Sequence, residues 1–248
     1  MNILGIDIGG SGIKGCPVDT KTGQMLAERF RVETPEGGKP KDMMNAIIQL
    51  IEHFEWKGPI GCGYPGVIRK QKICTAANLN KGWIGLNLAE LISNHTKTHT
   101  WVLNDADAAG IAEMRHGVGH EHSNDVVLLI TVGTGLGTAI FTKGQLLPNT
   151  ELGHIKIRGK EAEKRASGAV RKLEDLSWKE WSKRFDTYLR LLHSLFWPDL
   201  FIIGGGIVEK AEHFLPNLTV ETPIKIAQMG NQAGLIGAAI AAEEAMKK

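Results

Sequence analysis

The chain has 248 residues, 42% of them hydrophobic and 23% charged, with a formal net charge of +2, which allows a sizeable buried core and excludes a disordered or fibrous protein. No stretch approaches the roughly 20 apolar residues of a membrane span, and the first ten residues lack the pattern of a signal peptide. The cysteines Cys16, Cys62 and Cys74 are few and widely spaced, so we expect a cytoplasmic protein without a disulfide framework.

Apolar runs separated by glycines open the chain. Asn2–Ile8 is predicted to be a strand that enters the glycine turn 9–12, and Ile13–Val18 is predicted to be the next strand. Further along the first half, the patterns predict a strand at Met25–Val32, an amphipathic helix at Asp42–Phe54, strands at Ile60–Gly63 and Trp101–Leu103, and a helix at Asp105–His116.

The same strand, glycine turn and strand recur in the second half. Val126–Val132 enters the turn 133–137 and Thr138–Thr142 follows, half a chain length after the first copy. This spacing predicts a duplicated α/β lobe. Later patterns predict a helix at Lys183–Phe196, a buried strand at Leu200–Ile203 and an alanine-rich helix at Ala233–Ala245. We therefore expect an N-terminal lobe of residues 1–103, against which the closing helix 233–248 packs, and a C-terminal lobe of residues 104–232 with a basic insert at 156–184.

Both glycine turns offer backbone N–H groups of the kind that phosphoryl transfer requires. Backbone N–H groups in such turns bind phosphate oxygens, and cations neutralise the developing charge. The candidate phosphate-binding residues are Asp7, Gly9, Gly10, Ser11, Gly12 and Lys14 in the first segment, with Asp7 also holding Mg²⁺ through water, and Thr131, Gly133, Thr134, Gly135 and Gly137 in the second. Ordinary β-hairpins use glycine too, so the stronger signal is the occurrence of two such turns, which we expect to face each other.

An acidic residue stands where a predicted strand meets a predicted helix. Asn104 and Asp105 follow the strand Trp101–Leu103, at the sheet edge where ligands of α/β proteins bind. We expect Asp105 to act as general base on a sugar hydroxyl and Asn104 to orient the sugar. The alternative is that Asp105 only caps its helix.

Glu151 and His154 form a second polar pair, close after a predicted hairpin. They could grip adjacent sugar hydroxyls, but a Glu-x-x-His spacing also suits a surface pair or half of a metal site. The neighbouring sequence supplies too few further ligands for a metal.

Residues 156–184 contain ten Lys or Arg against five Asp or Glu. Such a stretch suits a polyanionic ligand, although it is also compatible with a solvated helical face. The candidate cations are Lys156, Arg158, Lys160, Lys164, Arg165, Arg171 and Lys172. We expect Trp178 and Trp181 to anchor the core.

Together these segments resemble the sugar kinases of the ROK family (repressors, open reading frames, kinases). The resemblance implies the two-lobed, ribonuclease H-like fold of actin, hexokinase and the Hsp70-like ATPases, with duplicated mixed-sheet halves. Residues 7–14 and 131–137 resemble the two phosphate motifs, residues 104–105 the base motif and residues 151–154 the sugar motif. The resemblance further implies sugar contacts from Gly63, Pro65 and Asn78, and contacts to the phosphoryl donor from Gly204, Gly205 and Gly206.

Two departures from the family pattern refine this expectation. ROK repressors carry a helix-turn-helix before the first strand, whereas here that strand begins at Asn2, so we expect no nucleic-acid binding. Most ROK kinases follow the Glu-x-x-His motif with a zinc-binding cysteine cluster whose last residue, a Glu, contacts the sugar. Here no cysteine follows His154, so no structural zinc is expected, and the group that replaces that Glu is left open.

The chain is most similar to the branch of this family that phosphorylates glucose from inorganic polyphosphate, through residues 5–15, Leu176–Trp181 and Pro198–Gly206. The resemblance implies an enzyme that makes glucose 6-phosphate with polyphosphate or ATP as donor and Mg²⁺ as cofactor, in a homodimer. The alternatives are a strictly ATP-dependent glucokinase of the same family and a non-catalytic sugar sensor.

Overall fold

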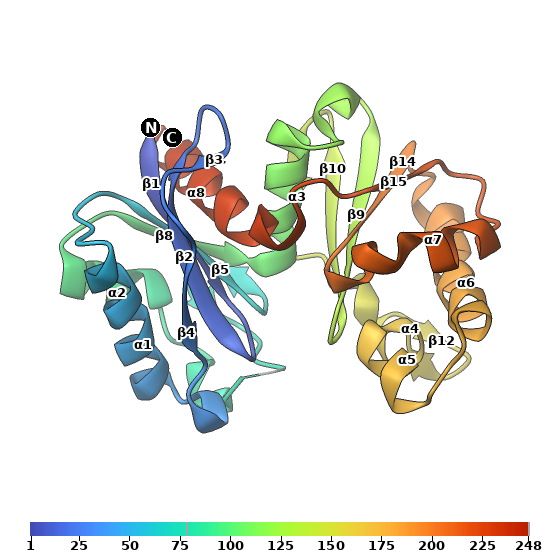
Figure 1. Cartoon of the computed structure of the whole chain (residues 1–248), viewed down its shortest axis with the longest axis horizontal. Helices are drawn as coiled ribbons and strands as arrows, with labels where there is room; N and C mark the ends of the chain where they lie inside the picture. Colours follow the sequence, from blue (N-terminus) through green and yellow to red (C-terminus); the bar gives the residue numbers. More distant parts are fainter. Residues whose placement is uncertain (78, 248) are drawn as a thin grey trace. The chain divides into compact units, whose positions relative to one another are not determined.

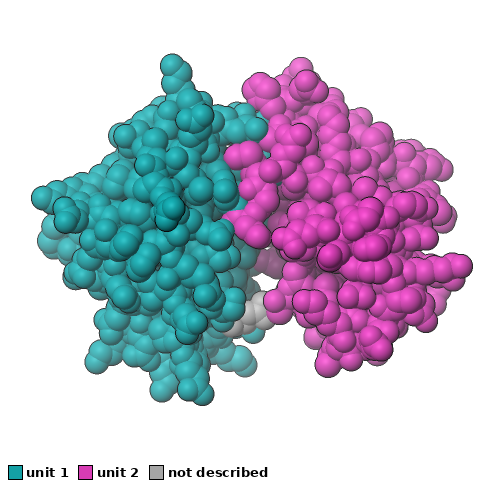
Figure 2. Space-filling view, viewed as in Figure 1, with its two compact units in different colours: residues 1–116, 232–248 teal, residues 117–231 magenta. Residues whose placement is uncertain are grey.

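The computed structural model describes residues 1–77 and 79–247, which form two compact units (Figures 1 and 2). Unit 1 consists of residues 1–116 and 232–248, and unit 2 of residues 117–231. The sequence pattern predicts a division of the chain after residue 103. The contacts instead group α3 (Asp105–His116) with unit 1, because α3 packs along α8 (Ala233–Met246).

The sheet of unit 1 combines an antiparallel hairpin with parallel strands, in the order β3-β2-β1-β5-β8, with β4 also pairing with β2. β1 and β2 are antiparallel, whereas β1, β5 and β8 are parallel neighbours. The strands are β1 Asn2–Ile8, β2 Gly12–Asp19, β3 Gln24–Met25, β4 Phe30–Glu33, β5 Ile60–Tyr64 and β8 Thr100–Asn104; a separate small hairpin pairs β6 Ile68–Arg69 with β7 Lys72–Ile73.

One face of this sheet contacts α8 almost backbone to backbone. Period-two alternation puts Gly5 of β1 on that face, where a Cβ would lie 2.0 Å from the carbonyl oxygen of Leu235. Gly61 of β5 meets Ala238 in the same way, at 1.9 Å. Only glycine fits this approach, which explains the alanine-rich helix that the sequence predicted.

The core on the other strand positions is aliphatic. Leu4, Ile6 and Ile8 of β1 cluster with Ile47 and Leu50 of α1, all of them fully buried. The amphipathic spacing of α1 (Pro40–His53) produces this face, and α2 (Leu88–Thr96) adds to the same cluster, beside β8. Asn87 caps α2 by accepting a hydrogen bond from the backbone N–H of Glu90.

Unit 2 repeats the strand arrangement of unit 1, with the order β11-β10-β9-β14-β15. β9 and β10 form the antiparallel hairpin, and β14 and β15 continue it with parallel strands. The strands are β9 Val126–Val132, β10 Leu136–Thr142, β11 Gln145–Leu147, β14 Leu200–Gly204 and β15 Ile224–Ile226. The duplicated halves with mixed sheets expected from the sequence are confirmed.

The long helix α6 (Trp178–Phe196) builds the core of unit 2. Its side chains Trp181, Phe185 and Tyr188 are fully buried against β9 and β14 residues in one cluster. A capping box between Ser177 and Glu180 starts the helix five residues before the predicted Lys183. The remaining elements of the unit are β12 Lys156–Ile157, β13 Lys160–Glu161, α4 Glu163–Ala166, α5 Gly168–Leu173 and α7 Ala211–Phe214.

The single strand predicted at Met25–Val32 is wrong. Met25 pairs with Val18 and Phe30 pairs with Gly15, so the four residues between β3 and β4 face only two residues of β2. One of those two is Pro17, which has no N–H to donate to a ladder, and the chain bulges there.

In the part of the chain that the structure describes, no helix combines the length and the apolar character that crossing a membrane requires.

Candidate active site

In unit 1 the candidate catalytic and phosphate-binding carboxylates lie at one edge of the sheet, where three parallel strands end. Register pairs Asp7 of β1 with Gly63 of β5, and Gly63 with Leu103 of β8. Asn104 and Asp105 come directly after Leu103. Ligands of α/β proteins bind at this end of parallel strands, so the register carries Asp7 and Asp105 to the edge where chemistry is expected.

Side chains from the segment around β4 hold the first glycine turn. Gly9 N–H donates to the carbonyl of Gly12 at 3.0 Å, which closes the turn. Thr34 Oγ1 donates to the carbonyl of Gly9 at 2.6 Å, and Arg31 Nη2 donates to the carbonyl of Ser11 at 2.6 Å. A Cβ at Gly12 would lie 2.4 Å from Arg31 Nε, so a larger residue there would displace the guanidinium that crosses the turn.

Asp7 is a half-buried carboxyl beside a cation. Burial raises its pKa, and the charges of Lys14 and Arg29 partly offset that rise. Lys14 Nζ lies 3.9 Å from Asp7 Oδ2. A Cβ at Gly234 would lie 3.1 Å from the Asp7 carboxyl, so the glycine leaves room for it. A carboxylate whose charge is poorly solvated suits a divalent cation, since Mg²⁺ prefers one or two carboxylate oxygens supplemented by water and substrate phosphates.

Asn104 performs the capping that the sequence offered as an alternative role for Asp105. Asn104 Oδ1 accepts from the N–H groups of Ala106 at 2.8 Å and Asp107 at 3.0 Å, while its Nδ2 donates to the carbonyl of Gly66 at 3.3 Å. Asp105 Oδ1 lies 2.8 Å from the Ala106 nitrogen, and its side chain is half-buried. The helix cap therefore does not depend on Asp105 alone.

The sugar residues predicted nearby belong to the same unit. A Cβ at Gly63 would lie 3.6 Å from Asp105 Cα, so β5 and the start of α3 are close. Pro65 follows β5 directly and precedes Gly66, whose carbonyl accepts from Asn104. Asn78, the third expected sugar contact in this region, lies outside the described residues.

In unit 2 the second glycine turn meets the glycine segment that follows β14. Thr131 of β9 pairs with Gly204 of β14, and Gly133 N–H donates to the carbonyl of Gly135 at 3.1 Å. Gly205 has a φ of +79°, and a Cβ there would lie 2.6 Å from the Val132 carbonyl oxygen. This contact requires glycine both for its backbone conformation and for its close approach.

A cavity of about 470 Å³ within unit 2 begins at this turn. Gly133 and Thr134 form one part of its wall and Gly206, at the start of the 3₁₀ helix η5 (Gly206–Lys210), forms another. A Cβ at Gly133 or Gly206 would meet no atom within 4 Å. The side chains of Arg171, Lys172, Glu209 and Lys210 carry the charge of the wall, and Trp178 supplies its aromatic surface.

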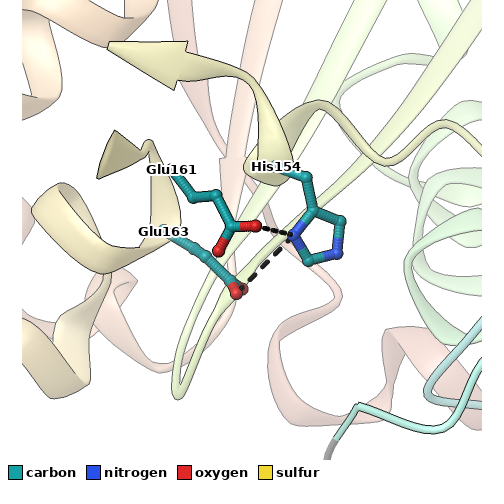
Figure 3. Close-up of side chains that lie close together, drawn as sticks. All are labelled: His154, Glu161 and Glu163. Atoms are coloured by element: carbon teal, nitrogen blue, oxygen red, sulfur yellow. Dashed lines mark ion pairs between the residues drawn. The ribbon is translucent and has the colours of Figure 1, made fainter. Parts of the chain in front are cut away.

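His154 lies among three carboxylates of unit 2. Its Nε2 is 3.6 Å from Glu151 Oε2, and its Nδ1 is 3.7 Å from both Glu161 Oε1 and Glu163 Oε1 (Figure 3). These separations are ion-pair contacts rather than hydrogen bonds. Burial raises the pKa of Glu151, and Glu163 adds to the rise while His154 opposes it. Gly153 permits the local fold, because a Cβ there would lie 2.3 Å from the Leu136 carbonyl oxygen.

The cluster offers a different donor set from a cysteine zinc site. Ligand atoms of His154, Glu161 and Glu163 lie within 4.8 Å of one another. The structure therefore brings together more candidate ligands than the neighbouring sequence predicted. Lys164 Nζ already pairs with Glu161 Oε2 at 2.5 Å and neutralises one of the carboxylates. Unit 2 contains no cysteine, so a cysteine-built zinc site does not fit it. The expected absence of structural zinc stays a prediction.

The structure divides the seven basic residues of the predicted polyanion track. Arg171 and Lys172 line the cavity. Among the described residues the other five do not line it: Lys156, Arg158 and Lys160 belong to the β12–β13 hairpin, and Lys164 and Arg165 to α4. Trp181 is a core anchor as expected, but Trp178 is only half-buried and faces the cavity.

Residues 3–170 match the sequence model of the ROK family. The chain belongs to the ROK family. It is 44% identical to a polyphosphate glucokinase of Mycobacterium tuberculosis over 239 residues, which cover 96% of this chain and 90% of that protein. A crystal structure of an inorganic polyphosphate/ATP-glucomannokinase from Arthrobacter sp. strain KM is 41% identical, with a TM-score of 0.94 over 100% of this chain and 99% of that one.

A more distant ROK structure supports the fold alone. The ROK family glucokinase from Streptomyces griseus, solved with glucose and AMPPNP, is 24% identical, with a TM-score of 0.84 over 98% of this chain and 100% of that one. The kinase-type α/β fold expected from the resemblance is thereby confirmed.

Sequence reasoning missed several residues at these edges. Arg31 and Thr34 hold the first turn, Lys210 lines the cavity, and Glu163 contacts His154. No motif marks the first three, because their positions depend on which strand and which helix end they face. Glu163 lies inside the basic stretch 156–184. The excess of Lys and Arg there favours a polyanion track and does not indicate a carboxylate beside His154.

Proposed function

We propose that this protein transfers a phosphoryl group from inorganic polyphosphate to the 6-hydroxyl of glucose, with ATP as a second donor. Full-length similarity to a polyphosphate glucokinase and to a polyphosphate/ATP-glucomannokinase supports the donor and the sugar. The observation that carries the proposal is the strand register of unit 1, which brings Asp7 and Asp105 to one sheet edge beside a glycine turn with fixed carbonyls.

Asp105 accepts the proton of the glucose 6-hydroxyl as that oxygen attacks the terminal phosphorus. The bond between this phosphorus and its bridging oxygen breaks, and the shortened polyphosphate leaves with the bonding electron pair. In unit 1 Asn104 orients the sugar, and in unit 2 Glu151 and His154 stay candidate sugar contacts. In unit 1 the backbone N–H groups of the glycine turn and the ammonium of Lys14 bind donor phosphates, and the N–H groups of the glycine turn of unit 2 are a second candidate for phosphate binding.

Asp7 is the residue that fits Mg²⁺, as a carboxylate ligand acting directly or through water. Bound there, the ion would neutralise charge on the transferring phosphoryl group. The Lys14 ammonium and the Asp7 carboxylate lie 3.9 Å apart. The sheet edge therefore offers a positive group to a phosphate and a negative group to its metal cation. The homodimer and the cytoplasmic location that the sequence implied stay predictions.

ATP is retained as a donor because the cavity of unit 2 has apolar as well as cationic walls. Trp178 and Ile207 line it, and either can contact an adenine base. A strictly ATP-dependent enzyme and a sugar sensor are the competing functions.

A donor and sugar panel on the purified protein tests the proposal. Glucose 6-phosphate is measured with polyphosphate and with ATP, at several salt concentrations. We expect product from both donors, with a much steeper salt dependence for polyphosphate, because a polyanion that contacts many phosphate-binding groups releases many counterions. Product from ATP alone would replace the proposal with an ATP-dependent glucokinase, and no product from either donor would favour the sensor.

A further inference from the structure

The cavity of unit 2 extends the second glycine turn with cations. It runs from Gly133 and Thr134 to α5 and to η5, and three of its lining residues, Arg171, Lys172 and Lys210, are cationic against the carboxylate of Glu209. Lys210 comes from the segment after β14, far in sequence from the basic stretch at 156–184. Two separate segments thus supply positive charge to one cavity.

Arg171 is held by the protein itself. Its guanidinium carbon lies 4.1 Å above the ring centre of Trp178, and its Nη1 donates to the carbonyl of Leu176 at 3.0 Å. Trp178 in turn stacks on His213 with a ring separation of 5.4 Å. These contacts give Arg171 a structural role in shaping the wall.

Lys172 and Lys210 differ from Arg171 in both exposure and pairing. Both side chains are exposed, and within residues 1–77 and 79–247 neither ammonium has a carboxylate at ion-pair distance. By contrast, Lys164 pairs with Glu161, and Arg184 pairs with Glu174 at 2.7 Å. Unpaired, solvated ammonium groups beside a phosphate turn retain their full attraction for an anion.

We propose that Lys172 and Lys210 bind the distal phosphates of a polyphosphate donor whose reacting end lies at the turn formed by Gly133, Thr134 and Gly135. The proposal deepens the proposed function and rests on it. It confines the polyphosphate path to the cavity, and it leaves the cations of the β12–β13 hairpin and of α4 off that path.

ATP makes different use of the same space. Beyond its third phosphate it continues as an uncharged nucleoside, which meets Trp178 and Ile207 rather than adding phosphates beside the two lysines. Removing both ammonium groups therefore weakens the binding of polyphosphate more than the binding of ATP. The loss of affinity grows with the number of phosphates in the chain.

The test compares the double variant Lys172→Gln, Lys210→Gln with the wild type. We expect the KM for long-chain polyphosphate to rise by about 10-fold, and the slope of log(kcat/KM) against log[salt] to become shallower by roughly 1 to 1.5, as for the loss of two phosphate contacts. With tripolyphosphate and with ATP, we expect kcat/KM to change by less than about 2-fold, because on this proposal the two lysines contact phosphates beyond the third from the reacting end.

A charge-matched control separates local contacts from net charge. Lys179 and Lys183 are exposed residues of α6 that do not line the cavity, so Lys179→Gln, Lys183→Gln removes the same charge from the same unit. Its KM and salt slope for long-chain polyphosphate should stay near wild type. Thermal unfolding midpoints of all the proteins establish that each variant folds.

Three results would overturn the inference: an unchanged salt slope in the cavity variant, an equal loss with tripolyphosphate, or an equal loss in the control. Wild-type protein that makes no glucose 6-phosphate from polyphosphate would instead refute the proposed function itself, so the two failures are distinguishable.

Discussion

The two glycine turns share a strand, turn and strand pattern but are held in different ways. In unit 1 the carbonyls of Gly9 and Ser11 accept hydrogen bonds from the side chains of Thr34 and Arg31. In unit 2 the carbonyl of Gly133 accepts from the backbone N–H of Ala169 in α5, at 3.1 Å. One turn is therefore fixed by side chains and the other by main chain.

The surroundings of the turns differ as well. The sheet edge of unit 1 carries the carboxylates Asp7 and Asp105, whereas the corresponding edge of unit 2 opens into a cavity with Lys172 and Lys210 on its wall. On the proposed function, the same local pattern serves acid–base chemistry and metal binding at the edge of one unit and anion binding at the edge of the other. Changes to the carboxylates of unit 1 should therefore lower turnover, whereas changes at either glycine turn or at the cavity of unit 2 should weaken donor binding.

The largest expected effect is on turnover, in unit 1. Asp105→Asn should lower kcat by at least about 100-fold, the scale for losing a general base, with little change in the KM for glucose. Since Asn104 caps α3, the variant should keep its thermal unfolding midpoint. Steady-state kinetics beside the exposed-surface control Asp42→Asn measure this, and near-wild-type kcat in Asp105→Asn would remove Asp105 from the mechanism.

A glycine substitution in unit 2 should reduce both stability and donor affinity. Gly205→Ala forces a side chain into a φ of +79° and against the Val132 carbonyl, which should cost about 1–3 kcal/mol of unfolding free energy. Gly206→Ala is the matched control for stability, because its Cβ would meet no atom within 4 Å. Denaturant unfolding of both variants compares them, and equal stability would contradict the close-approach argument.

Loosening the first turn should have a smaller effect, and one specific to the donor. Arg31→Ala and Thr34→Val each remove a hydrogen bond to a turn carbonyl, and we expect the donor KM to rise by roughly 3- to 10-fold while the KM for glucose stays constant. Arg69→Ala, at an exposed position of the same unit, is the control. A parallel rise in both KM values would indicate general damage rather than loss of turn positioning.

The smallest effect concerns the pH dependence of stability. Burial raises the pKa of Glu151 in the folded protein, so this group stabilises the fold below its unfolded pKa, and that contribution is lost as pH rises through the folded pKa. Glu151→Gln cannot ionise, and it should be more stable than the wild type at pH 7 but not at pH 4. Thermal unfolding without substrates, with His154, Glu161, Glu163 and Lys164 intact, measures the difference. A variant less stable than the wild type at pH 7 would contradict the prediction, because it would show that the folded protein favours the ionised form of Glu151.

Regular elements with a strong period could be predicted from the sequence. Strands β1 and β9 and helix α3 have the predicted bounds, because alternating or continuous apolar runs end at glycines or at the Asn104 cap. The glycine turns after β1 and β9 could be predicted from the same pattern, whereas the role of Asp105 as base and phosphate binding by the turns stay predictions. The start of α6 was readable as well, since Ser177 and Glu180 have capping-box spacing, but the prediction began the helix at Lys183.

Contacts that depend on register could not be predicted. Arg31 reaches Ser11 across 20 positions and Thr34 reaches Gly9 across 25, and both contacts require β4 to pair with β2 after the bulge at Pro17. Lys210 joins Lys172 only because β14 lies beside β9. Composition finds a basic stretch, but only the tertiary structure separates the cations that line a cavity from those that pair with acids.

The contact between Gly5 and Leu235 also bears on how the protein is made. Unit 1 begins with β1, but its sheet face is covered by α8, which the ribosome synthesises only after all of unit 2. Unit 2 is continuous and can fold during translation, whereas the strands of unit 1 wait with one apolar face uncovered. The sheet of unit 1 is therefore completed only when a helix encoded after unit 2 packs against it.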